Sequence, residues 1–127
     1  LAQWWQERLG PTDQPVVDNG AGLSRAARLS PRALARMLQQ AWASPVMPEF
    51  VASLPIVGVD GTLRRRPALV SGAAHLKSGS LRDVTALAGY VLAASGQRYV
   101  LVAMVNHPNA GAARPALDAL IAWSAAD

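Results

Sequence analysis

Residues 73–106, AAHLKSGSLRDVTALAGYVLAASGQRYVLVAMVN, carry the strongest secondary-structure signal in the chain. Two apolar runs, 85–93 and 98–106, are rich in the valine, leucine and tyrosine residues typical of strands, and residues 73–81 before them can form a first strand. Short connections join these three segments, and the second connection, 94–97, contains Ser-Gly at a turn. Because short connections join antiparallel neighbours, we predict an antiparallel sheet of three strands.

Helical periodicity lies on both sides of this sheet in the sequence. Ser30-Pro31 begins one helix, since the serine oxygen can cap free N–H groups and proline fits the first helical position. Apolar residues then recur at helical spacing up to Trp42, and two further helices are predicted over 1–9 and 113–125. The second and third strands are almost continuously apolar, which indicates that helices cover the sheet. The predicted fold class is α+β, an antiparallel sheet flanked by helices.

Composition narrows the classes of protein to which the chain can belong. Its 127 residues fit one domain or part of one, and the absence of cysteine excludes disulfides, thiol chemistry and zinc–cysteine sites. The net charge of +4 comes from scattered arginines. The longest uncharged runs are shorter than the roughly 20 residues of a membrane helix, so no transmembrane segment is expected. The chain opens on a helical pattern without a signal peptide, and we interpret it as a piece whose targeting information, if any, lies upstream.

Lys77-Ser78-Gly79-Ser80, near the end of the first strand, is the candidate site. Lys77 is the only lysine among twelve lysine and arginine residues. A compact ammonium can serve an anionic site where a planar guanidinium cannot, and a glycine lets another backbone approach closely. Lys77 and Ser78 alternate between the two faces of the strand, so they can serve one site only if this strand lies at the edge of the sheet.

Other conspicuous residues favour structural interpretations. We expect Trp4 and Trp5 to pack on a helical stripe, Trp123 to pack against the sheet or the first helix, and Arg32 and Arg36 to form a solvated helix face. The run Arg64-Arg65-Arg66 is typical of a solvated loop, although it could bind anionic groups.

The two histidines do not indicate a metal site. His75 and His107 have no metal-ligand spacing to each other or to carboxylates, and we expect them at strand ends or at the surface. His75 could also line the edge that carries Lys77.

Four segments in order carry a specific resemblance: DNGAGLSR at 18–25, LP leading to GVDGTL within 54–63, KSGSL at 77–81, and LAGY with SGQR within 87–98. Together they resemble the C-terminal part of the penicillin-binding D-alanyl-D-alanine carboxypeptidases of serine peptidase family S13. The resemblance covers nearly the whole chain. It implies that residues 1–127 form the C-terminal part of one penicillin-binding domain of the β-lactamase/transpeptidase type.

The resemblance also implies a function and a role for each site residue. The family acts on peptidoglycan peptides ending in D-Ala-D-Ala through an acyl-enzyme and is inhibited by β-lactams. Lys77 would supply positive charge and help to organise proton transfer, and the Ser78 hydroxyl would bind the terminal carboxylate. Gly79 would permit close approach, and the backbone N–H of Ser80 would be one of two oxyanion-hole donors. Neither a metal nor an organic cofactor is implied.

The family's nucleophile is not in this chain. The chemistry needs a Ser-x-x-Lys motif, but Ala74 stands three positions before Lys77, and no serine is followed two positions later by asparagine. The chain alone is therefore expected to be inactive, with the nucleophile in a missing N-terminal part of the same domain.

Two other functions remain open. One is an inactive peptidoglycan-binding or interaction domain of the same fold. The other is an arginine-rich module for anionic polymers, based on residues 64–66 and the net charge; nucleic acid itself is not expected, because no aromatic residues are interleaved with the arginines. The resemblance implies an exported protein, periplasmic or associated with the cell wall.

Overall fold

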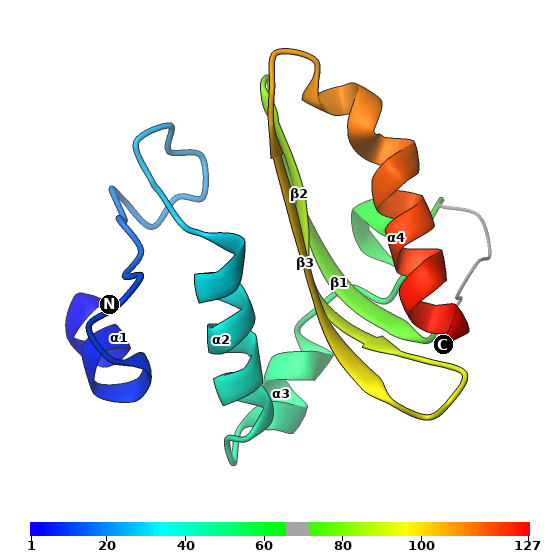
Figure 1. The fold of residues 1–127 in the computed structure, drawn as a ribbon, viewed down its shortest axis with the longest axis horizontal. Coiled ribbons are helices and arrows are strands. Elements are labelled where there is room, and N and C mark those ends of the chain that lie inside the picture. The colour runs from blue at the N-terminus through cyan, green and yellow to red at the C-terminus, as the bar shows by residue number, and fades with distance from the viewer. Residues whose placement is uncertain (66–71) are drawn as a thin grey trace.

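The computed structural model describes residues 1–65 and 72–127 of the chain, and Figure 1 shows its helices and strands. In chain order the elements are α1 (Ala2–Leu9), α2 (Pro31–Trp42), α3 (Met47–Ala52), the short 3-10 helix η1 (Gly61–Leu63), β1 (Ala74–Leu81), β2 (Val84–Leu92), β3 (Arg98–Asn106), a second 3-10 helix η2 (Ala110–Ala113) and α4 (Arg114–Ala126). Helices lie on both sides of one sheet, which confirms the predicted α+β class.

The sheet contains the three predicted strands in the order β1-β2-β3, and both pairings are antiparallel. The observed strand boundaries agree with the predicted ones to within one residue. Leu81 pairs with Val84, which leaves Arg82 and Asp83 as the turn between β1 and β2. Within residues 1–65 and 72–127, β1 therefore lies at one edge of the sheet and β3 at the other.

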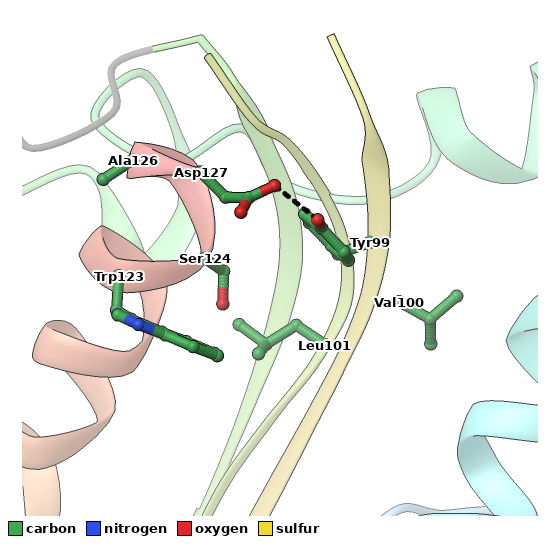
Figure 2. Close-up of a pocket in the computed structure, with 7 residues that line it drawn as sticks. All are labelled: Tyr99, Val100, Leu101, Trp123, Ser124, Ala126 and Asp127. Carbon is green, nitrogen blue, oxygen red and sulfur yellow. Dashed lines mark hydrogen bonds between the residues drawn. The ribbon is translucent and has the colours of Figure 1, made fainter. Parts of the chain in front are cut away.

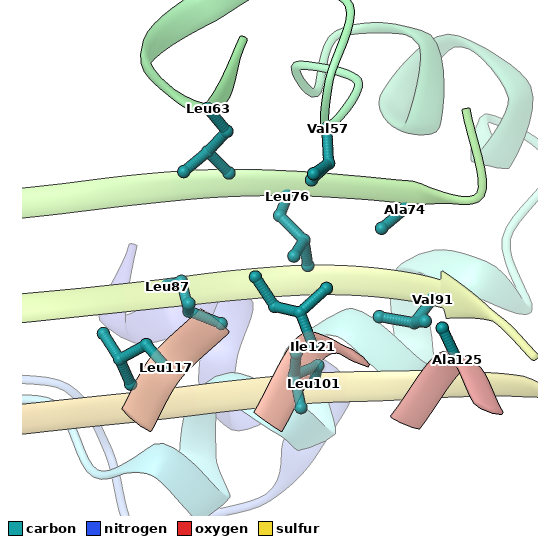
Figure 3. Packing of buried hydrophobic residues seen from close by; sticks show 10 residues of the cluster. All are labelled: Val57, Leu63, Ala74, Leu76, Leu87, Val91, Leu101, Leu117, Ile121 and Ala125. Atoms are coloured by element: carbon teal, nitrogen blue, oxygen red, sulfur yellow. The ribbon is translucent and has the colours of Figure 1, made fainter. Parts of the chain in front are cut away.

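One face of the sheet packs against α4 and forms the larger hydrophobic core (Figure 3). Leu117 and Ile121 of α4 lie over the strands, and Val57 and Leu63 join them from the segment before β1. The cluster consists of Val57, Leu63, Ala74, Leu76, Leu87, Val91, Leu101, Leu117, Ile121 and Ala125. Full burial of a leucine contributes about 1.5–3 kcal/mol, so completely buried Leu76 anchors β1 firmly in this core.

The other face of the sheet packs against α2, as Figure 1 shows. The predicted start of α2 is confirmed: Pro31 is its first residue, and the Ser30 hydroxyl accepts a hydrogen bond of 2.9 Å from the N–H of Ala33. On its far side, α2 meets α1 through a smaller core of Trp5, Leu9 and Ala33. Both faces of the sheet are thus covered by helices.

Tyr90 of β2 joins the sheet to α2 and α3. Its ring centroid lies 5.1 Å from that of Trp42 and 6.5 Å from that of Phe50. Its buried hydroxyl donates a 2.7 Å hydrogen bond to the carbonyl oxygen of Leu38. Burial raises the pKa of Tyr90 above its ordinary value, because the charged phenolate would be poorly solvated there.

Three expectations about single side chains are wrong. Trp5 is buried, but Trp4 is 41% exposed, because the partner helix α2 covers only one side of the eight-residue α1. Trp123 is 75% exposed, since the face of α4 that packs on the sheet carries Leu117 and Ile121. Arg36 is only partly exposed, because its guanidinium donates to the carbonyl oxygen of Leu9 at the end of α1.

One expectation falls partly outside the described residues. Arg64 and Arg65 are exposed, whereas Arg66, the third residue of the arginine run, lies in the segment 66–71 that the structure does not describe. Across the described residues, no helix has the length and apolar character needed to cross a membrane.

We predict that Tyr90→Phe lowers the free energy of unfolding by about 1 kcal/mol, since the ring contacts remain and one buried hydrogen bond is lost. The substitution also removes a titrating group. Because the folded-state pKa of Tyr90 is raised, its contribution to stability is complete below the ordinary pKa of about 10 and is lost as the pH rises further. Denaturant unfolding at neutral pH and at pH values above about 10 measures both effects.

Tyr99→Phe is the matched control, because the Tyr99 hydroxyl hydrogen-bonds Asp127 at the surface. It should change stability by less than about 0.5 kcal/mol at neutral pH. Equal losses for the two variants at neutral pH would show that the bond to Leu38 does not tie α2 to the sheet.

Candidate active site

Among residues 1–65 and 72–127, the outer edge of β1 is hydrogen-bonded along its first half, whereas its second half has no backbone partner. The N–H of Val57 donates to the carbonyl of Ala74 over 2.9 Å, and the N–H of Leu76 donates to the carbonyl of Pro55 over 2.9 Å. Residues with even numbers in β1 thus turn their backbone groups away from β2. By the same alternation, Ser78 and Ser80 direct their N–H and C=O groups to the outer edge, beyond the segment that pairs with Ala74 and Leu76.

The Lys77 ammonium reaches the backbone of Ser78 at this edge, although the Lys77 and Ser78 side chains lie on opposite faces of the strand. The Lys77 side chain is exposed, and its ammonium donates a 2.8 Å hydrogen bond to the carbonyl oxygen of Ser78. The flexible stem therefore brings the charge from the α2 side of the sheet to the edge. The edge position that the sequence argument requires for these two residues is present.

The Ser78 hydroxyl has a partner from a different part of the chain. On the α4 side of the sheet it forms a hydrogen bond with the hydroxyl of Thr62 in η1. Gly79 follows on the other face, where a Cβ built on it would have no atom within 4 Å. The Lys77 ammonium, the Ser78 hydroxyl and the Ser80 N–H thus gather along one open stretch of strand.

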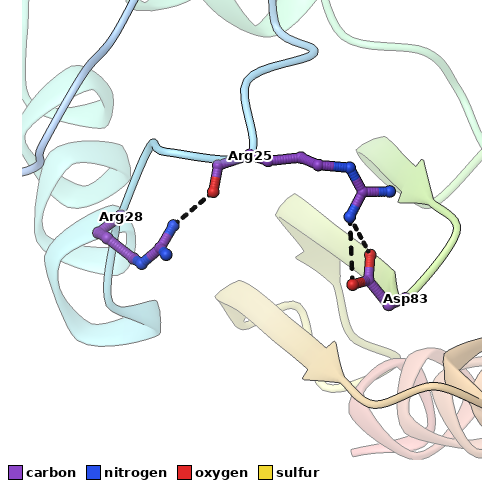
Figure 4. A network of polar contacts seen from close by, with 3 residues as sticks. All are labelled: Arg25, Arg28 and Asp83. Atoms are coloured by element: carbon purple, nitrogen blue, oxygen red, sulfur yellow. Dashed lines mark hydrogen bonds and ion pairs between the residues drawn. The ribbon is translucent and has the colours of Figure 1, made fainter.

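Hydrogen bonds hold the glycine-containing loop 18–25 together internally, and an ion pair joins it to the turn between β1 and β2. Asp18 accepts a 2.8 Å hydrogen bond from the Ser24 hydroxyl. One nitrogen of Arg25 contacts both carboxylate oxygens of Asp83, at 2.9 and 3.2 Å, and Arg28 donates to the carbonyl of Arg25 (Figure 4). The ion pair is exposed and contributes only about 0–1 kcal/mol, so its main effect is to place the loop.

A pocket of about 610 Å³ lies between the sheet and residues 15–29, the segment that contains this loop. Its walls are loop residues from Pro15 to Leu29 and, on the sheet, residues at the ends of all three strands. One of the latter is Ala86, the cross-strand partner of Gly79, so the pocket lies on the same face of the sheet as Lys77 and Gly79.

A second pocket, of about 450 Å³, lies on the opposite face between the start of β3 and the end of α4 (Figure 2). The exposed ring of Trp123 and the side chain of Leu101 line it, and Tyr99 donates a 2.5 Å hydrogen bond to Asp127 beside it. That hydrogen bond raises the pKa of Tyr99 above its ordinary value. None of the predicted site residues lines this pocket.

Comparison with known families identifies the architecture. The model of the D-Ala-D-Ala carboxypeptidase 3 (S13) family matches residues 10–126. The chain belongs to this family. The resemblance carried by the four sequence segments is therefore confirmed, and the antiparallel sheet flanked by helices is the S13 version of the penicillin-binding fold.

Curated S13 relatives are much longer than this chain. The D-alanyl-D-alanine carboxypeptidase of Actinomadura sp. (strain R39) is 33% identical over 114 residues, which are 84% of this chain and 21% of the relative. The D-alanyl-D-alanine carboxypeptidase DacB of Haemophilus influenzae is 30% identical over 100 residues, or 76% of this chain and 21% of the relative. The S13 chain thus spans about a fifth of their length.

Solved structures share the fold at lower identity. Penicillin binding protein 4 (dacB) from Haemophilus influenzae superposes with a TM-score of 0.76 at 24% identity, over 94% of this chain and 30% of that one. The Bd3459 predatory endopeptidase from Bdellovibrio bacteriovorus gives a TM-score of 0.73 at 14% identity, over 94% of this chain and 34% of that one.

The predicted site residues of the S13 chain come together, and two contacts were not foreseen. Thr62 and Arg25 both lie in segments that carried the resemblance, yet nothing in their spacing showed that one contacts Ser78 and the other Asp83. A side chain's partner across the fold depends on tertiary structure, so only an alignment or a structure could have revealed these contacts.

The histidines lie near the strand ends. His75 is half-buried in β1, and its Nδ1 has no hydrogen-bond partner among the described residues. His107 is exposed after β3 and accepts a 3.0 Å hydrogen bond from the N–H of Asn109. In the parts of the chain that the structure describes, no three His, Asp or Glu side chains are grouped as metal ligands.

Proposed function

We propose that residues 1–127 are the C-terminal part of one penicillin-binding domain in an exported serine-type D-Ala-D-Ala carboxypeptidase/endopeptidase of the periplasm or cell wall. The observation that carries this proposal is the open edge of β1, where the Lys77 ammonium, the Ser78 hydroxyl and the outward N–H of Ser80 lie together. The membership of the S13 family supports the same chemistry.

The open edge suits an extended peptide that ends in a carboxylate. Such a peptide can pair with the outward N–H and C=O groups of Ser78 and Ser80 as an added strand. Its terminal carboxylate accepts from the Ser78 hydroxyl, with the positive charge of Lys77 nearby. Gly79 adds no side chain that would keep the peptide away, since its Cβ position faces open space.

The reaction follows from this placement and from a serine outside residues 1–127. The serine oxygen attacks the carbonyl carbon of the penultimate D-Ala, and the developing oxyanion accepts from the N–H of Ser80. The peptide bond breaks, and the terminal D-Ala leaves with the serine's proton. Water then hydrolyses the acyl-enzyme. Lys77 contributes to the charge balance of the proton transfers, and no step needs a metal or cofactor.

β-Lactams fit the same site, because they carry a carboxylate next to a reactive amide. Penicillin binding protein 4 of Haemophilus influenzae has been solved with a β-lactam, and a Bd3459 structure is described as penicillin G acylated. We therefore propose that β-lactams acylate the intact protein that contains this chain, and that residues 1–127 alone stay unreacted.

Release of D-Ala from a peptide ending in D-Ala-D-Ala tests the carboxypeptidase activity. The intact protein should release free D-Ala from this peptide and none from the matched peptide ending in L-Ala-L-Ala. If the folded intact protein binds peptidoglycan but releases no D-Ala, the inactive wall-binding domain becomes the better account.

A further inference from the structure

Residues 55–63, which follow α3, place the hydroxyl of Thr62 against Ser78. Their backbone is fastened to the edge of β1 by the two hydrogen bonds that join Pro55 and Val57 to Leu76 and Ala74. The segment then turns into η1, where Thr62 meets the Ser78 hydroxyl. The backbone hydrogen bonds to β1 end at Leu76, two residues before Ser78, and Thr62 then contacts the Ser78 side chain.

Four consecutive residues at the end of the GVDGTL sequence, 60–63, have a role in this geometry. The Asp60 carboxylate accepts a 2.6 Å hydrogen bond from the N–H of Ile56, which closes the loop. Gly61 has a φ of +60°, and a Cβ there would lie 2.9 Å from the Cβ of Pro55. Leu63, only 1% exposed, is anchored in the core. Between these fixed points Thr62 is exposed, so packing does not explain its hydroxyl.

We propose that Thr62 is a positioning residue that orients the Ser78 hydroxyl for the terminal carboxylate of the substrate. This inference rests on the proposed function. Either hydroxyl can donate in the free protein. A carboxylate can only accept, so its arrival fixes the direction of the chain: Thr62 donates to Ser78, and Ser78 donates to the carboxylate.

Two physical effects make Thr62 matter for carboxylate recognition. A donor to the Ser78 oxygen polarises the Ser78 O–H and strengthens the bond that it gives to an anion. The contact also restricts the Ser78 rotamer, so less conformational freedom is lost when the ligand binds. Both effects act only on ligands that carry the carboxylate.

The test compares benzylpenicillin with its methyl ester, which lacks the free carboxylate, as acylating agents of the intact protein. The ratio of the two acylation rate constants measures carboxylate selectivity. It does not depend on the fraction of folded protein, because both constants come from one sample. Thr62→Val should lower this ratio about 10-fold, which corresponds to about 1.4 kcal/mol. Thr62→Ser, which keeps the hydroxyl, should stay within about threefold of the wild type, a difference well below one charge-assisted hydrogen bond.

Repeating the Thr62 substitution in a protein that already lacks the Ser78 hydroxyl shows whether Thr62 acts through Ser78. In a Ser78→Ala protein, adding Thr62→Val should leave the ratio unchanged. An unchanged ratio for Thr62→Val alone, or an equal drop in the Ser78→Ala background, overturns the inference while the acylation itself still supports the proposed function. If the folded wild type is acylated by neither compound, the proposed function fails and the inference fails with it. If Thr62→Val does not fold, Thr62→Ala replaces it with the same expected drop.

Discussion

Lys77→Ala in the intact protein is expected to lower the rate of acylation by benzylpenicillin by at least about 1000-fold, within the range that positioned proton-transfer groups contribute. The ammonium lies 2.8 Å from the Ser78 carbonyl at the open edge, next to the groups proposed to bind the substrate. The fold should survive, because the side chain is exposed, and substitutions at such positions change stability by about 0.5 kcal/mol or less. Stopped-flow or mass-resolved acylation kinetics and thermal unfolding measure the two quantities.

Arg114→Ala is the matched control for the loss of one positive charge. Arg114 is exposed at the start of α4, which packs on the opposite face of the sheet. Its removal should leave the acylation rate within about twofold, since Arg114 begins a helix on the opposite face of the sheet from Lys77 and salt screens exposed charges. Lys77→Arg should not restore activity, because a planar guanidinium cannot take the place of a compact ammonium. Normal acylation by Lys77→Ala would remove Lys77 from the site.

Gly89→Ala is expected to have the largest effect on stability. Gly89 of β2 pairs with Leu76 of β1 and has a φ of +150°, a conformation that residues with a side chain rarely adopt. A Cβ at this position would lie 2.1 Å from the backbone oxygen of His75. Because a backbone atom cannot move aside as a side chain can, the β1–β2 pairing must shift. We predict a loss of about 3 kcal/mol or more, with β1 displaced from the sheet.

Gly79→Ala separates strain from the mere presence of a methyl group. Gly79 lies in the neighbouring strand, its φ is not positive, and its Cβ position is open. Thermal or denaturant unfolding should show a change of less than about 1 kcal/mol for this variant, since only backbone entropy is affected. A loss for Gly89→Ala as small as that for Gly79→Ala would mean that the close contact with His75 is easily relieved.

The sheet was predictable because its signals are local. Residues 98–106 are strongly apolar and end at recognisable turns, and the predicted bounds of β3 are the observed ones. The start of α2 follows equally from Ser30 and Pro31, whose capping chemistry acts within one helical turn. In both cases the information needed for the prediction lies within a few residues of the element itself.

Contacts between distant segments were not predictable in the same way. Trp4 and Trp123 are apolar enough for a core, but a sequence pattern does not show whether another element covers them, and here both are exposed. The bond between Thr62 and Ser78 joins a turn to a strand, and it depends on how the loop after Pro55 attaches to the edge of β1. The sequence predicted that Lys77 and Ser78 need an edge strand, and the three-dimensional fold supplies it.

The most direct test of the account is intact mass spectrometry after incubation with a fluorescent penicillin, applied to the intact protein and to residues 1–127 alone. We predict one covalent adduct on the intact protein and none on residues 1–127, because the nucleophilic serine is expected upstream of this chain. An intact protein that is folded but carries no adduct would contradict the proposed penicillin-binding function, and an adduct on residues 1–127 would contradict the position of the nucleophile.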